Sequence, residues 1–334
     1  MKILITGFAG FIGFHASREL LRRGWEVVGI DNFCDYYNVK LKRDRAALLE
    51  GQPGFSAREL DICDHAKLHG VFTMEAPDVV LNLAAQPGVR YSIDHPFVYE
   101  KTNLEGFLNV LECCRHAAKV PKLVYASSSS VYGGNKKMPF EESDKVDNPV
   151  SLYAATKKAN EEMGHAWAHI NQLPITLFRF FTVYGPWGRP DMAPFKFTRG
   201  ILEGRPIDVY NHGKMWRDFT YVGDLVRGIR LLMDAVPGGP ETAVEGDSLS
   251  PVAPYRIVNI GNSSKVRLED FIEAIERATG KQAIRNYMDM QPGDIPATWA
   301  DCTLLQRLTG YQPQTDIRDG MERFVEWYRE YYGR

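Results

Sequence analysis

The stretch KILITGFAGFIG, residues 2–13, decides the fold because it joins an apolar run directly to glycines at positions 7, 10 and 13. An apolar run of this length fits a buried strand, and helical periodicity follows over residues 11–23. Glycine permits a tight turn between the two elements and lets backbone N–H groups approach a pyrophosphate at the positive end of the helix. The stretch therefore predicts the start of a dinucleotide-binding fold.

Strand-like and helical segments alternate through the first half of the chain. Such alternation is typical of a parallel sheet whose crossover helices cover both faces. We therefore predict an α/β fold with a Rossmann-type doubly wound parallel sheet. The expected strands are residues 2–6, 25–31, 55–62, 78–85, 122–128 and 175–181, and the expected helices are residues 11–23, 97–118 and 151–171.

After about residue 184 the pattern becomes irregular and richer in Pro and Gly. We expect residues 1–183 to form the dinucleotide-binding domain, with residues 216–238 and about 297–303 packing back onto it. The rest of 184–334 should form a smaller C-terminal α/β domain that binds the substrate. Its expected elements are strands 207–210, 216–222 and 255–261, helices 222–235, 267–279, 301–308 and 316–331, and a surface loop at 237–254.

The composition favours a small-molecule partner. Lys and Arg number 40 and Asp and Glu number 42, so no basic excess indicates a nucleic-acid or membrane surface. The five cysteines are odd in number and, like the histidines, show no metal-ligand spacing, so we expect no metal. Reduced cysteines, no signal peptide and no apolar run long enough to span a bilayer predict a soluble, cytoplasmic protein.

Asp31 ends the second predicted strand, near the distance at which an acid binds the adenosine ribose hydroxyls. Its carboxylate would repel a 2′-phosphate. Asn32 follows it and no arginine is adjacent, so NAD is favoured over NADP. The simpler interpretation is a glycine turn followed by a surface acid, but strand, turn, helix and acid coincide here.

A serine run and a Tyr/Lys pair provide the candidate chemistry. Residues 125–134 read YASSSSVYGG, so the serines follow an apolar strand directly. Tyr153 and Lys157 are four residues apart and share one face of a predicted helix. Alone, such a pair is usually solvated surface. Downstream of serines in a dinucleotide-binding fold, it indicates a catalytic site.

Together these motifs resemble the extended short-chain dehydrogenase/reductase family. The resemblance covers essentially the whole chain and rests on GFAGFIG, LNLAA at 81–85, Asn103 in TNLEG, SSSSVYG, and the Tyr153/Lys157 pair. It implies bound NAD and a homodimer formed through helices 97–118 and 151–171. The implied cofactor-binding residues are Gly7, Gly10, Phe11, Ile12, Gly13, Asp31, Asn32, Asp61, Ile62, Leu83, Ala84, Ala85, Asn103, Tyr153 and Lys157.

The family chemistry needs these residue types for physical reasons. Tyrosine in water has a pKa of about 10, too high for a base at neutral pH. A neighbouring Lys157 ammonium and a positive nicotinamide would favour the phenolate. Tyr153 could then take a proton from a sugar hydroxyl while hydride leaves the same carbon. Ser128 would orient the reacting oxygen, and Ser130 would add a second hydroxyl contact.

Residues after Ser128 restrict the outcome. Family members that dehydrate nucleotide sugars carry an acidic pair there, whereas this chain has Ser129 and Ser130. Without an acid and a base for elimination, dehydration is not expected. The oxidised sugar can then take hydride back on its other face, which is epimerisation, or lose carbon dioxide.

The run FRFFTVYGPWGRPDM, residues 178–192, suggests which sugar is bound. Thr182 stands where epimerases of neutral hexoses usually carry asparagine, and Arg189 offers a fork that matches a carboxylate. The combination, with the serines and MQPGDIPATWAD near 290–301, resembles family members that epimerise UDP-glucuronate at C4. For Arg189, a solvated loop or a diphosphate contact is the alternative. The implied substrate-binding residues are Ser129, Thr182, Arg189, Arg90, Arg217, Phe195, Val209, Tyr210 and Asp294, although core packing is equally plausible for Phe195, Val209 and Tyr210.

The resemblance therefore implies an isomerase that converts UDP-glucuronate to UDP-galacturonate through a 4-keto intermediate, with NAD as cofactor. The alternatives are a neutral UDP-hexose 4-epimerase, a UDP-glucuronate decarboxylase and a non-catalytic NAD-sensing scaffold. The decarboxylase usually brings an acidic residue near the serine motif, and scaffolds commonly lose the Tyr or the Lys.

Overall fold

The computed structural model describes residues 1–291 and 294–333. Its larger lobe is built on a seven-stranded sheet in the order β10-β6-β5-β4-β1-β2-β3, with every neighbouring pair parallel. The predicted doubly wound sheet is confirmed. The strands are β1 (Lys2–Thr6), β2 (Glu26–Asp31), β3 (Phe55–Glu59), β4 (Val79–Asn82), β5 (Lys122–Ala126), β6 (Ile175–Phe180) and β10 (Tyr255–Ile260).

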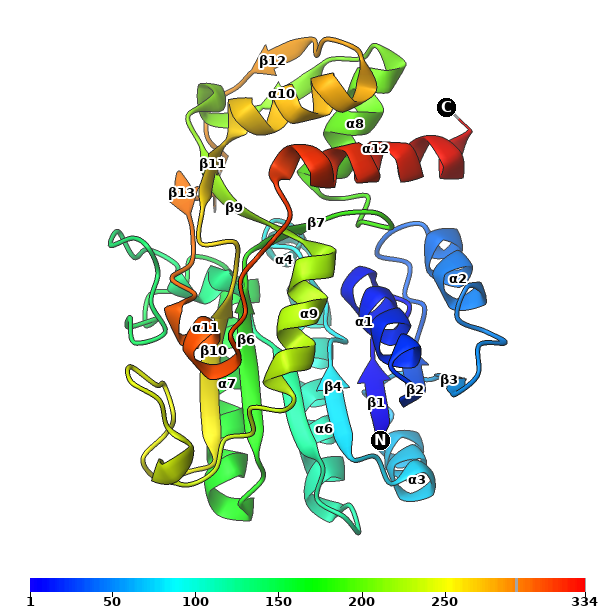
Figure 1. Cartoon of the computed structure of the whole chain (residues 1–334), viewed down its shortest axis with the longest axis vertical. Helices are drawn as coiled ribbons and strands as arrows, with labels where there is room; N and C mark the ends of the chain where they lie inside the picture. Colours follow the sequence, from blue (N-terminus) through cyan, green and yellow to red (C-terminus); the bar gives the residue numbers. More distant parts are fainter. Residues whose placement is uncertain (292–293, 334) are drawn as a thin grey trace.

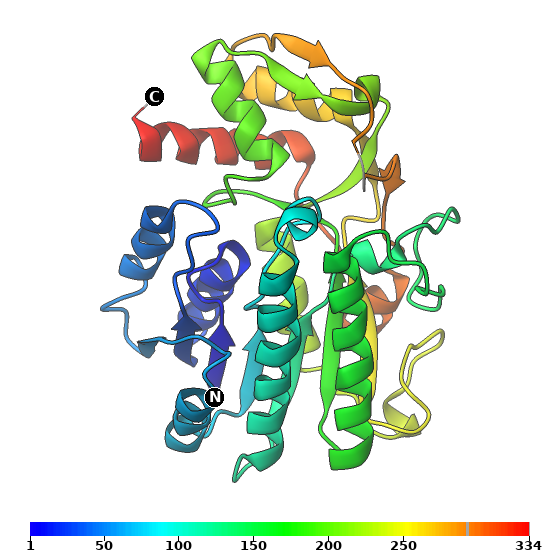
Figure 2. The same cartoon turned by 180° about the vertical axis from the view of Figure 1, so that it is seen from behind.

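Helices cover both faces of this sheet (Figures 1 and 2). One face carries α1 (Phe11–Arg22), α9 (Val222–Leu232) and α11 (Thr303–Thr309), and the other carries α3 (His65–Glu75), α6 (Gly106–His116) and α7 (Leu152–Asn171). Each layer has its own apolar core, because the strands are buried on both sides.

The smaller lobe lies beyond the carboxyl ends of these strands (Figure 1). In its main sheet, β9 (Trp216–Tyr221) pairs with β7 (Thr182–Tyr184), β11 (Lys265–Arg267) and β13 (Ala297–Thr298). A second pair joins β8 (Ile207–Val209) to β12 (Arg285–Tyr287). Helices α8 (Ala193–Glu203), α10 (Leu268–Thr279) and α12 (Ile317–Tyr332) close a separate core around Phe271 and Phe324.

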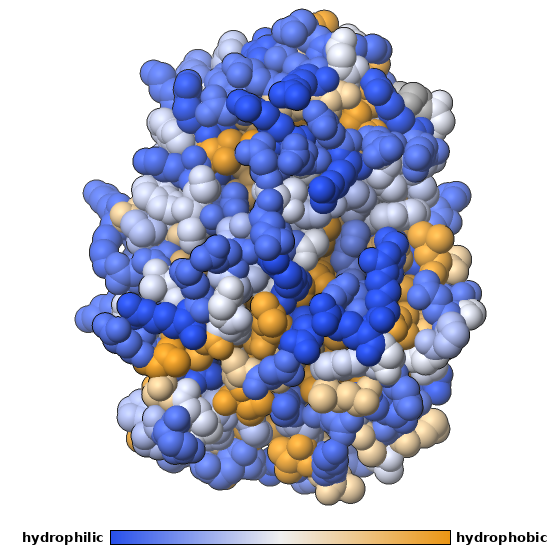
Figure 3. Space-filling model, viewed as in Figure 1, coloured by the Kyte–Doolittle hydropathy of each residue, from blue (hydrophilic) through white to orange (hydrophobic). Residues whose placement is uncertain are grey.

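Short helical segments complete the chain. They are α2 (Val39–Ala47), α4 (Tyr91–Asp94), α5 (Pro96–Tyr99), the π-helical η1 (Glu100–Glu105), and the 3-10 segments η2 (Ser129–Tyr132), η3 (Tyr210–Gly213) and η4 (Pro240–Thr242). The face seen in Figure 3 is mainly hydrophilic, with apolar side chains in scattered small groups. Within the described residues, no helix is both long and apolar enough to cross a membrane.

The predicted domain boundary is wrong for the strand at residues 255–261, which belongs to the larger lobe. The sequence pattern places it in the second domain, but β10 pairs with β6 along its whole length and forms one edge of the larger sheet. Its buried Val258 and Ile260 belong to that core. Residues 216–221, predicted to pack back onto the first domain, instead form the centre of the smaller sheet, whereas the following helix α9 does pack against α1.

Among the described residues, four helices, α2, α3, α4 and α8, lie outside the predicted ones, and the expected helix 97–118 divides into α5, η1 and α6. Helix α2 shows why. Its segment VKLKRDRAA looks solvent-exposed, yet Lys42 and Arg45 are buried by tertiary contacts that the local pattern does not contain.

A buried ion pair connects α7 to β6 behind the serine run. Glu161 Oε1 accepts hydrogen bonds from Arg179 Nε (3.0 Å) and Ser127 Oγ (2.6 Å), and Glu161 Oε2 accepts from Arg179 Nη2 (2.8 Å). Both side chains are 2% exposed. Each charge depends on the other, because an unpaired charge at this depth is costly.

We expect Glu161→Ala to lower the free energy of unfolding by about 3–5 kcal/mol, since it leaves Arg179 buried without its carboxylate. The adjacent Glu162 provides a matched control: its side chain is 68% exposed and pairs with Lys158. Glu162→Ala should change stability by less than about 1 kcal/mol. Urea denaturation of both variants measures the difference, and equal losses would contradict the assignment.

Candidate active site

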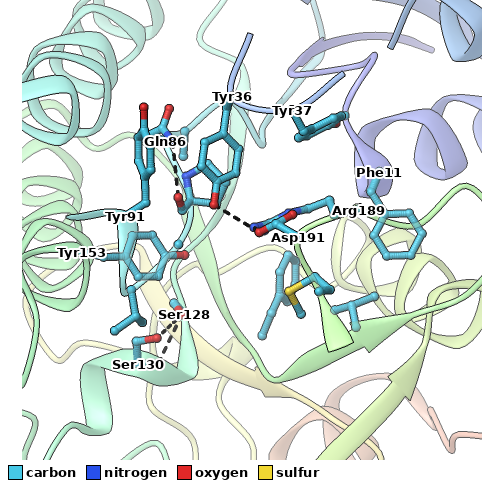
Figure 4. A pocket seen from close by; sticks show the side chains of 18 of the residues that line it. Phe11, Tyr36, Tyr37, Gln86, Tyr91, Ser128, Ser130, Tyr153, Arg189 and Asp191 are labelled. Carbon is cyan, nitrogen blue, oxygen red and sulfur yellow. Dashed lines mark hydrogen bonds and ion pairs between the residues drawn. The ribbon is translucent and has the colours of Figure 1, made fainter. Parts of the chain in front are cut away.

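One large cavity, about 1070 Å³, lies where the carboxyl ends of the parallel strands face the smaller lobe (Figure 4). Both lobes line it. Parallel strands end at a common edge, so residues distant in sequence converge there. Of the residues predicted from sequence, the lining contains all except Asn103, Phe195 and Val209.

The glycine-rich turn is packed so closely that side chains are excluded. A Cβ on Gly7, whose φ is +74°, would lie 2.9 Å from the Ala84 nitrogen. A Cβ on Gly13 would lie 2.1 Å from the Gly7 oxygen. Gly10 is the N-cap residue of α1 and makes no side-chain hydrogen bond to the helix, so the first N–H groups of α1 are available to an anion. This geometry fits the pyrophosphate of NAD.

Asp31 ends β2 at the edge of the cavity. Its Oδ2 accepts the Ala9 N–H (3.2 Å) and its Oδ1 accepts the Phe33 N–H (2.8 Å). Burial raises the pKa of this carboxyl, and the charge of Lys42 opposes that effect. Nearby, Asn32 Nδ2 donates to Asp61 Oδ2 (2.9 Å). The position suits the adenosine ribose, with Asp61 and Ile62 also in the lining.

Asn103 is buried and makes contacts that position the loop after β4. Its Oδ1 accepts the Gln86 N–H (2.8 Å), and its Nδ2 donates to the Gln86 oxygen (3.1 Å) and Thr156 Oγ1 (3.1 Å). It therefore fixes the backbone that follows Leu83, Ala84 and Ala85, three residues that line the cavity themselves. The cofactor-binding role that the family resemblance implies for Asn103 stays a prediction.

Tyr153 lies in the first turn of α7, which Ser151 caps by accepting the Ala154 N–H (3.1 Å). Figure 4 shows its ring beside Ser128 in the cavity. Burial raises the pKa of the Tyr153 phenol, while a hydrogen bond with Ser128 and the charge of Arg189 lower it. The net direction in the chain alone is upward, so the predicted depression of the pKa needs a further positive charge.

Lys157 lies one helical turn further along α7. Its Nζ donates to the Ala126 oxygen (2.9 Å) at the end of β5. Burial lowers the pKa of the ammonium to about 8, and the Glu161 carboxylate opposes that shift. The predicted Tyr/Lys face is therefore present, but Lys157 is held against the strand end next to the serines.

The four serines divide into two roles. Ser127 donates to Glu161 and so belongs to the buried ion pair. Ser128 Oγ accepts the Ser130 N–H (3.2 Å) and donates to Ser130 Oγ (3.1 Å), while Ser129 opens the η2 turn. All four line the cavity, and Figure 4 shows Ser128 and Ser130 on the same side of it as Tyr153.

Arg189 forms an ion pair that the sequence analysis did not anticipate. Its Nε donates to Asp191 Oδ1 (3.1 Å) and its Nη2 donates to Asp191 Oδ2. Asp191 Oδ2 also accepts the Tyr36 hydroxyl (3.1 Å; Figure 4). All three residues and Thr182 line the cavity. The RPD motif was the available signal for Asp191, whereas nothing local indicated Tyr36.

Arg45 connects the cofactor turn to the Arg189 turn. Its fully buried guanidinium donates to the Ala9 oxygen (2.9 Å), the Trp187 oxygen (2.6 Å), the Gly188 oxygen (3.3 Å) and the Tyr37 hydroxyl (2.7 Å). The Arg45 guanidinium thus links three separate segments of the chain, at residue 9, residue 37 and residues 187–188.

The far end of the cavity carries the residues predicted to bind UDP. Arg90 Nη2 donates to Asp294 Oδ2 (2.7 Å) across the two lobes, and Arg90 Cζ lies 4.7 Å from the Tyr210 ring centroid. Arg217 lines the same end. Two members of the MQPGDIPATWAD motif, residues 292–293, lie outside the described residues.

Phe195 and Val209 lie in the core of the smaller lobe. They are 3% and 0% exposed, and the Phe195 ring packs edge-to-face on Tyr328 of α12, with centroids 5.2 Å apart. Core packing was the alternative considered for them. Phe197 and Ile207, from the same elements, line the cavity instead.

Known proteins resemble this chain closely. The NAD dependent epimerase/dehydratase family model matches residues 3–261. The chain belongs to this family. Protein CapI of Staphylococcus aureus is 53% identical, with 99% of each chain covered. A probable UDP-glucuronate 4-epimerase of Rhizobium meliloti is 49% identical, covering 100% of this chain and 98% of the relative.

A crystal structure of UDP-glucuronic acid 4-epimerase from Bacillus cereus, in complex with UDP-glucuronic acid and NAD, is similar along the whole chain. Its TM-score is 0.87 at 34% identity, and the match covers 99% of this chain and 100% of that one. The family predicted from the sequence motifs is thereby confirmed.

We expect Gly13→Ala to reduce roughly tenfold the NAD retained by the purified protein, because accommodating the methyl costs about 1–3 kcal/mol. NAD released on denaturation, measured per chain, is the readout. Gly70→Ala is the control: it lies on α3 and its added Cβ meets nothing within 4 Å. Unchanged NAD content in Gly13→Ala would contradict the pyrophosphate site.

Lys157→Met should make the chain more stable at neutral pH. The Lys157 pKa falls from 10.5 to about 8 on folding, so folding disfavours the ammonium fully below pH 8 and progressively less up to pH 10.5. The substitution also removes the hydrogen bond to Ala126. With that loss included, the free energy of unfolding at pH 7 should rise by on the order of 2 kcal/mol. Urea denaturation at pH 7 to 10 should show the advantage shrinking as pH rises; a pH-independent difference would refute this account.

Proposed function

We propose that this chain catalyses the NAD-dependent C4 epimerisation of UDP-glucuronate to UDP-galacturonate through a transient 4-keto intermediate. The observation that carries the proposal is that Tyr153 and Ser128 face the same cavity as Arg189 and Thr182. The groups that can transfer a proton and the guanidinium that can bind a carboxylate therefore line the same cavity and can contact one ligand. The names of the relatives described above support the same substrate.

Tyr153 and Ser128 handle the proton at C4. NAD, when bound, supplies the acceptor that takes hydride from C4 and later returns it. Tyr153 accepts the proton of the C4 hydroxyl, and Ser128 holds the oxygen by a hydrogen bond. The charge of Arg189 favours the phenolate. The family chemistry assigns the same role to the Lys157 ammonium, which lies one helical turn further along α7. Tyr153 returns the proton after the sugar has turned to present its other face.

Thr182, Ser129, Ser130 and Arg189 hold the C6 carboxylate. The 4-ketohexuronate is a β-keto acid, which loses carbon dioxide once its carboxylate stands perpendicular to the ketone plane. Several donors acting together can fix another orientation. Retention of the carboxylate therefore depends on the donors that line this part of the cavity.

A neutral UDP-hexose 4-epimerase is the second candidate, and one observation favours it. The Arg189 guanidinium is already paired with Asp191, so the cavity has less free positive charge than the sequence suggested. A UDP-glucuronate decarboxylase would use the same first step. Incubation with UDP-glucuronate and with UDP-glucose, followed by product analysis, separates UDP-galacturonate, UDP-galactose and UDP-pentose as outcomes.

We also propose a cytoplasmic homodimer. The five free cysteines suit a reducing compartment. The apolar side chains of Phe97 and Ile93 are 83% and 62% exposed, beside the helices expected to form the dimer. Exposed apolar groups of this size are covered when two copies associate.

Tyr153→Phe should lower kcat for UDP-glucuronate by about 10³-fold, because general acid–base catalysis contributes that order. Binding of UDP-glucuronate should stay within about threefold, since the ring is retained. Tyr287→Phe is the control: its hydroxyl donates to Glu269 Oε1 (3.2 Å), and Tyr287 does not line the cavity that the described residues form. A variant that still interconverts the two uronates at the normal rate would exclude Tyr153 as the base.

A further inference from the structure

Asp191 occupies the position on Arg189 that a substrate carboxylate would be expected to take. The Nε and Nη2 edge of the guanidinium binds both oxygens of Asp191, which is the bidentate geometry used to recognise carboxylates. The two side chains are 23% and 27% exposed and line the cavity that holds Tyr153. An acidic sugar entering the cavity therefore meets an arginine that already has a carboxylate partner.

Tyr36 keeps Asp191 in this position. Its hydroxyl donates to Asp191 Oδ2, and the ring packs on the loop after β4, where a Cβ on Gly88 would come within 2.5 Å of the hydroxyl. Burial would raise the pKa of Asp191, but the charge and hydrogen bonds of Arg189 and the Tyr36 hydroxyl outweigh it and lower the pKa. The Arg189–Asp191 pair is therefore ionised and has no net charge.

Epimerisation places a demand on this pair that simple binding does not. The 4-keto sugar must turn inside the cavity, and its carboxylate moves with it. A charged guanidinium without a partner would bind that carboxylate bidentately and hold the ring in one orientation. A guanidinium neutralised by Asp191 offers only its remaining donors. It can direct the carboxylate and still release it.

We propose that Asp191, held by Tyr36, is a positioning residue that limits the grip of Arg189 on the sugar carboxylate and so permits the ring to turn. The inference rests on the proposed function. It assigns Asp191 a role in turnover of acidic sugars that neutral sugars do not need.

The test compares binding of an acidic and a neutral nucleotide sugar. In a Tyr153→Phe background, which blocks turnover, Asp191→Asn should tighten UDP-glucuronate binding about tenfold, because it frees a charge-assisted contact. UDP-glucose binding should stay within about twofold. With Tyr153 intact, KM and kcat for UDP-glucuronate should both fall, kcat by about tenfold. Calorimetry gives the dissociation constants.

Three further variants separate positioning from structural support. Tyr36→Phe should shift binding in the same direction by a smaller factor, and it keeps the test open if Asp191→Asn folds poorly. Asp191→Glu restores the carboxylate and should return the UDP-glucuronate/UDP-glucose affinity ratio toward that of the unsubstituted chain. Asp234→Asn removes the carboxylate of a surface Arg–Asp pair on the end of α9 and should change neither ratio nor rate.

The outcomes distinguish the two proposals. If Asp191→Asn and Tyr36→Phe weaken both ligands equally or leave the affinity ratio unchanged, Asp191 is only structural and the inference is overturned. If the unsubstituted chain binds UDP-glucuronate but forms no UDP-galacturonate, the proposed function fails, and with it the turning role of Asp191. A shifted ratio with unchanged kcat also overturns the inference, because the grip would then not limit turnover.

Discussion

The close approach of two strand ends is the constraint on which the site depends. A methyl group on Gly7 would collide with the Ala84 backbone, so β1 and β4 end in contact. Thr6 Oγ1 joins them further by accepting the Leu83 and Ala84 N–H groups and donating to Asn82 Oδ1. This contact brings the N-terminus of α1, which has no side-chain cap, beside the loop after β4 that Asn103 positions. The cofactor cradle is thus made largely of backbone.

Buried charge defines the other half of the site. Glu161 and Arg179 fix Ser127, and the same α7 helix carries Tyr153 and Lys157 on its cavity side. Burial acts on both catalytic groups against their charged forms, since it raises the pKa of Tyr153 and lowers that of Lys157. The fold thus buries Tyr153 and Lys157 in surroundings that favour the neutral phenol and the neutral amine. Additional positive charge near Tyr153 would favour its phenolate.

Much of this could be predicted from the sequence, because the relevant signals are local. GFAGFIG, Asp31, the serine run and the Tyr153/Lys157 spacing each lie within one turn or helix, and the structure brings them to one cavity. What was missed depends on tertiary contact. The Asp191–Tyr36 bond joins residues 155 apart in sequence, and Arg45 reaches carbonyls more than 140 positions away. No periodicity encodes such pairs. Phe195 and Val209 illustrate the converse, because apolar type alone does not tell core from cavity wall.

Arg45 has a consequence for how this scaffold can change. One cation holds carbonyls of the glycine turn and of the 187–188 segment, and lysine, a single ammonium with three donors, cannot span acceptors so widely placed. The two turns are therefore joined through one side chain into a single hydrogen-bonded block. A change of ligand preference is therefore expected to come from substitution of side chains on these two turns. A shift of their main chain would leave the buried Arg45 guanidinium without its carbonyl acceptors.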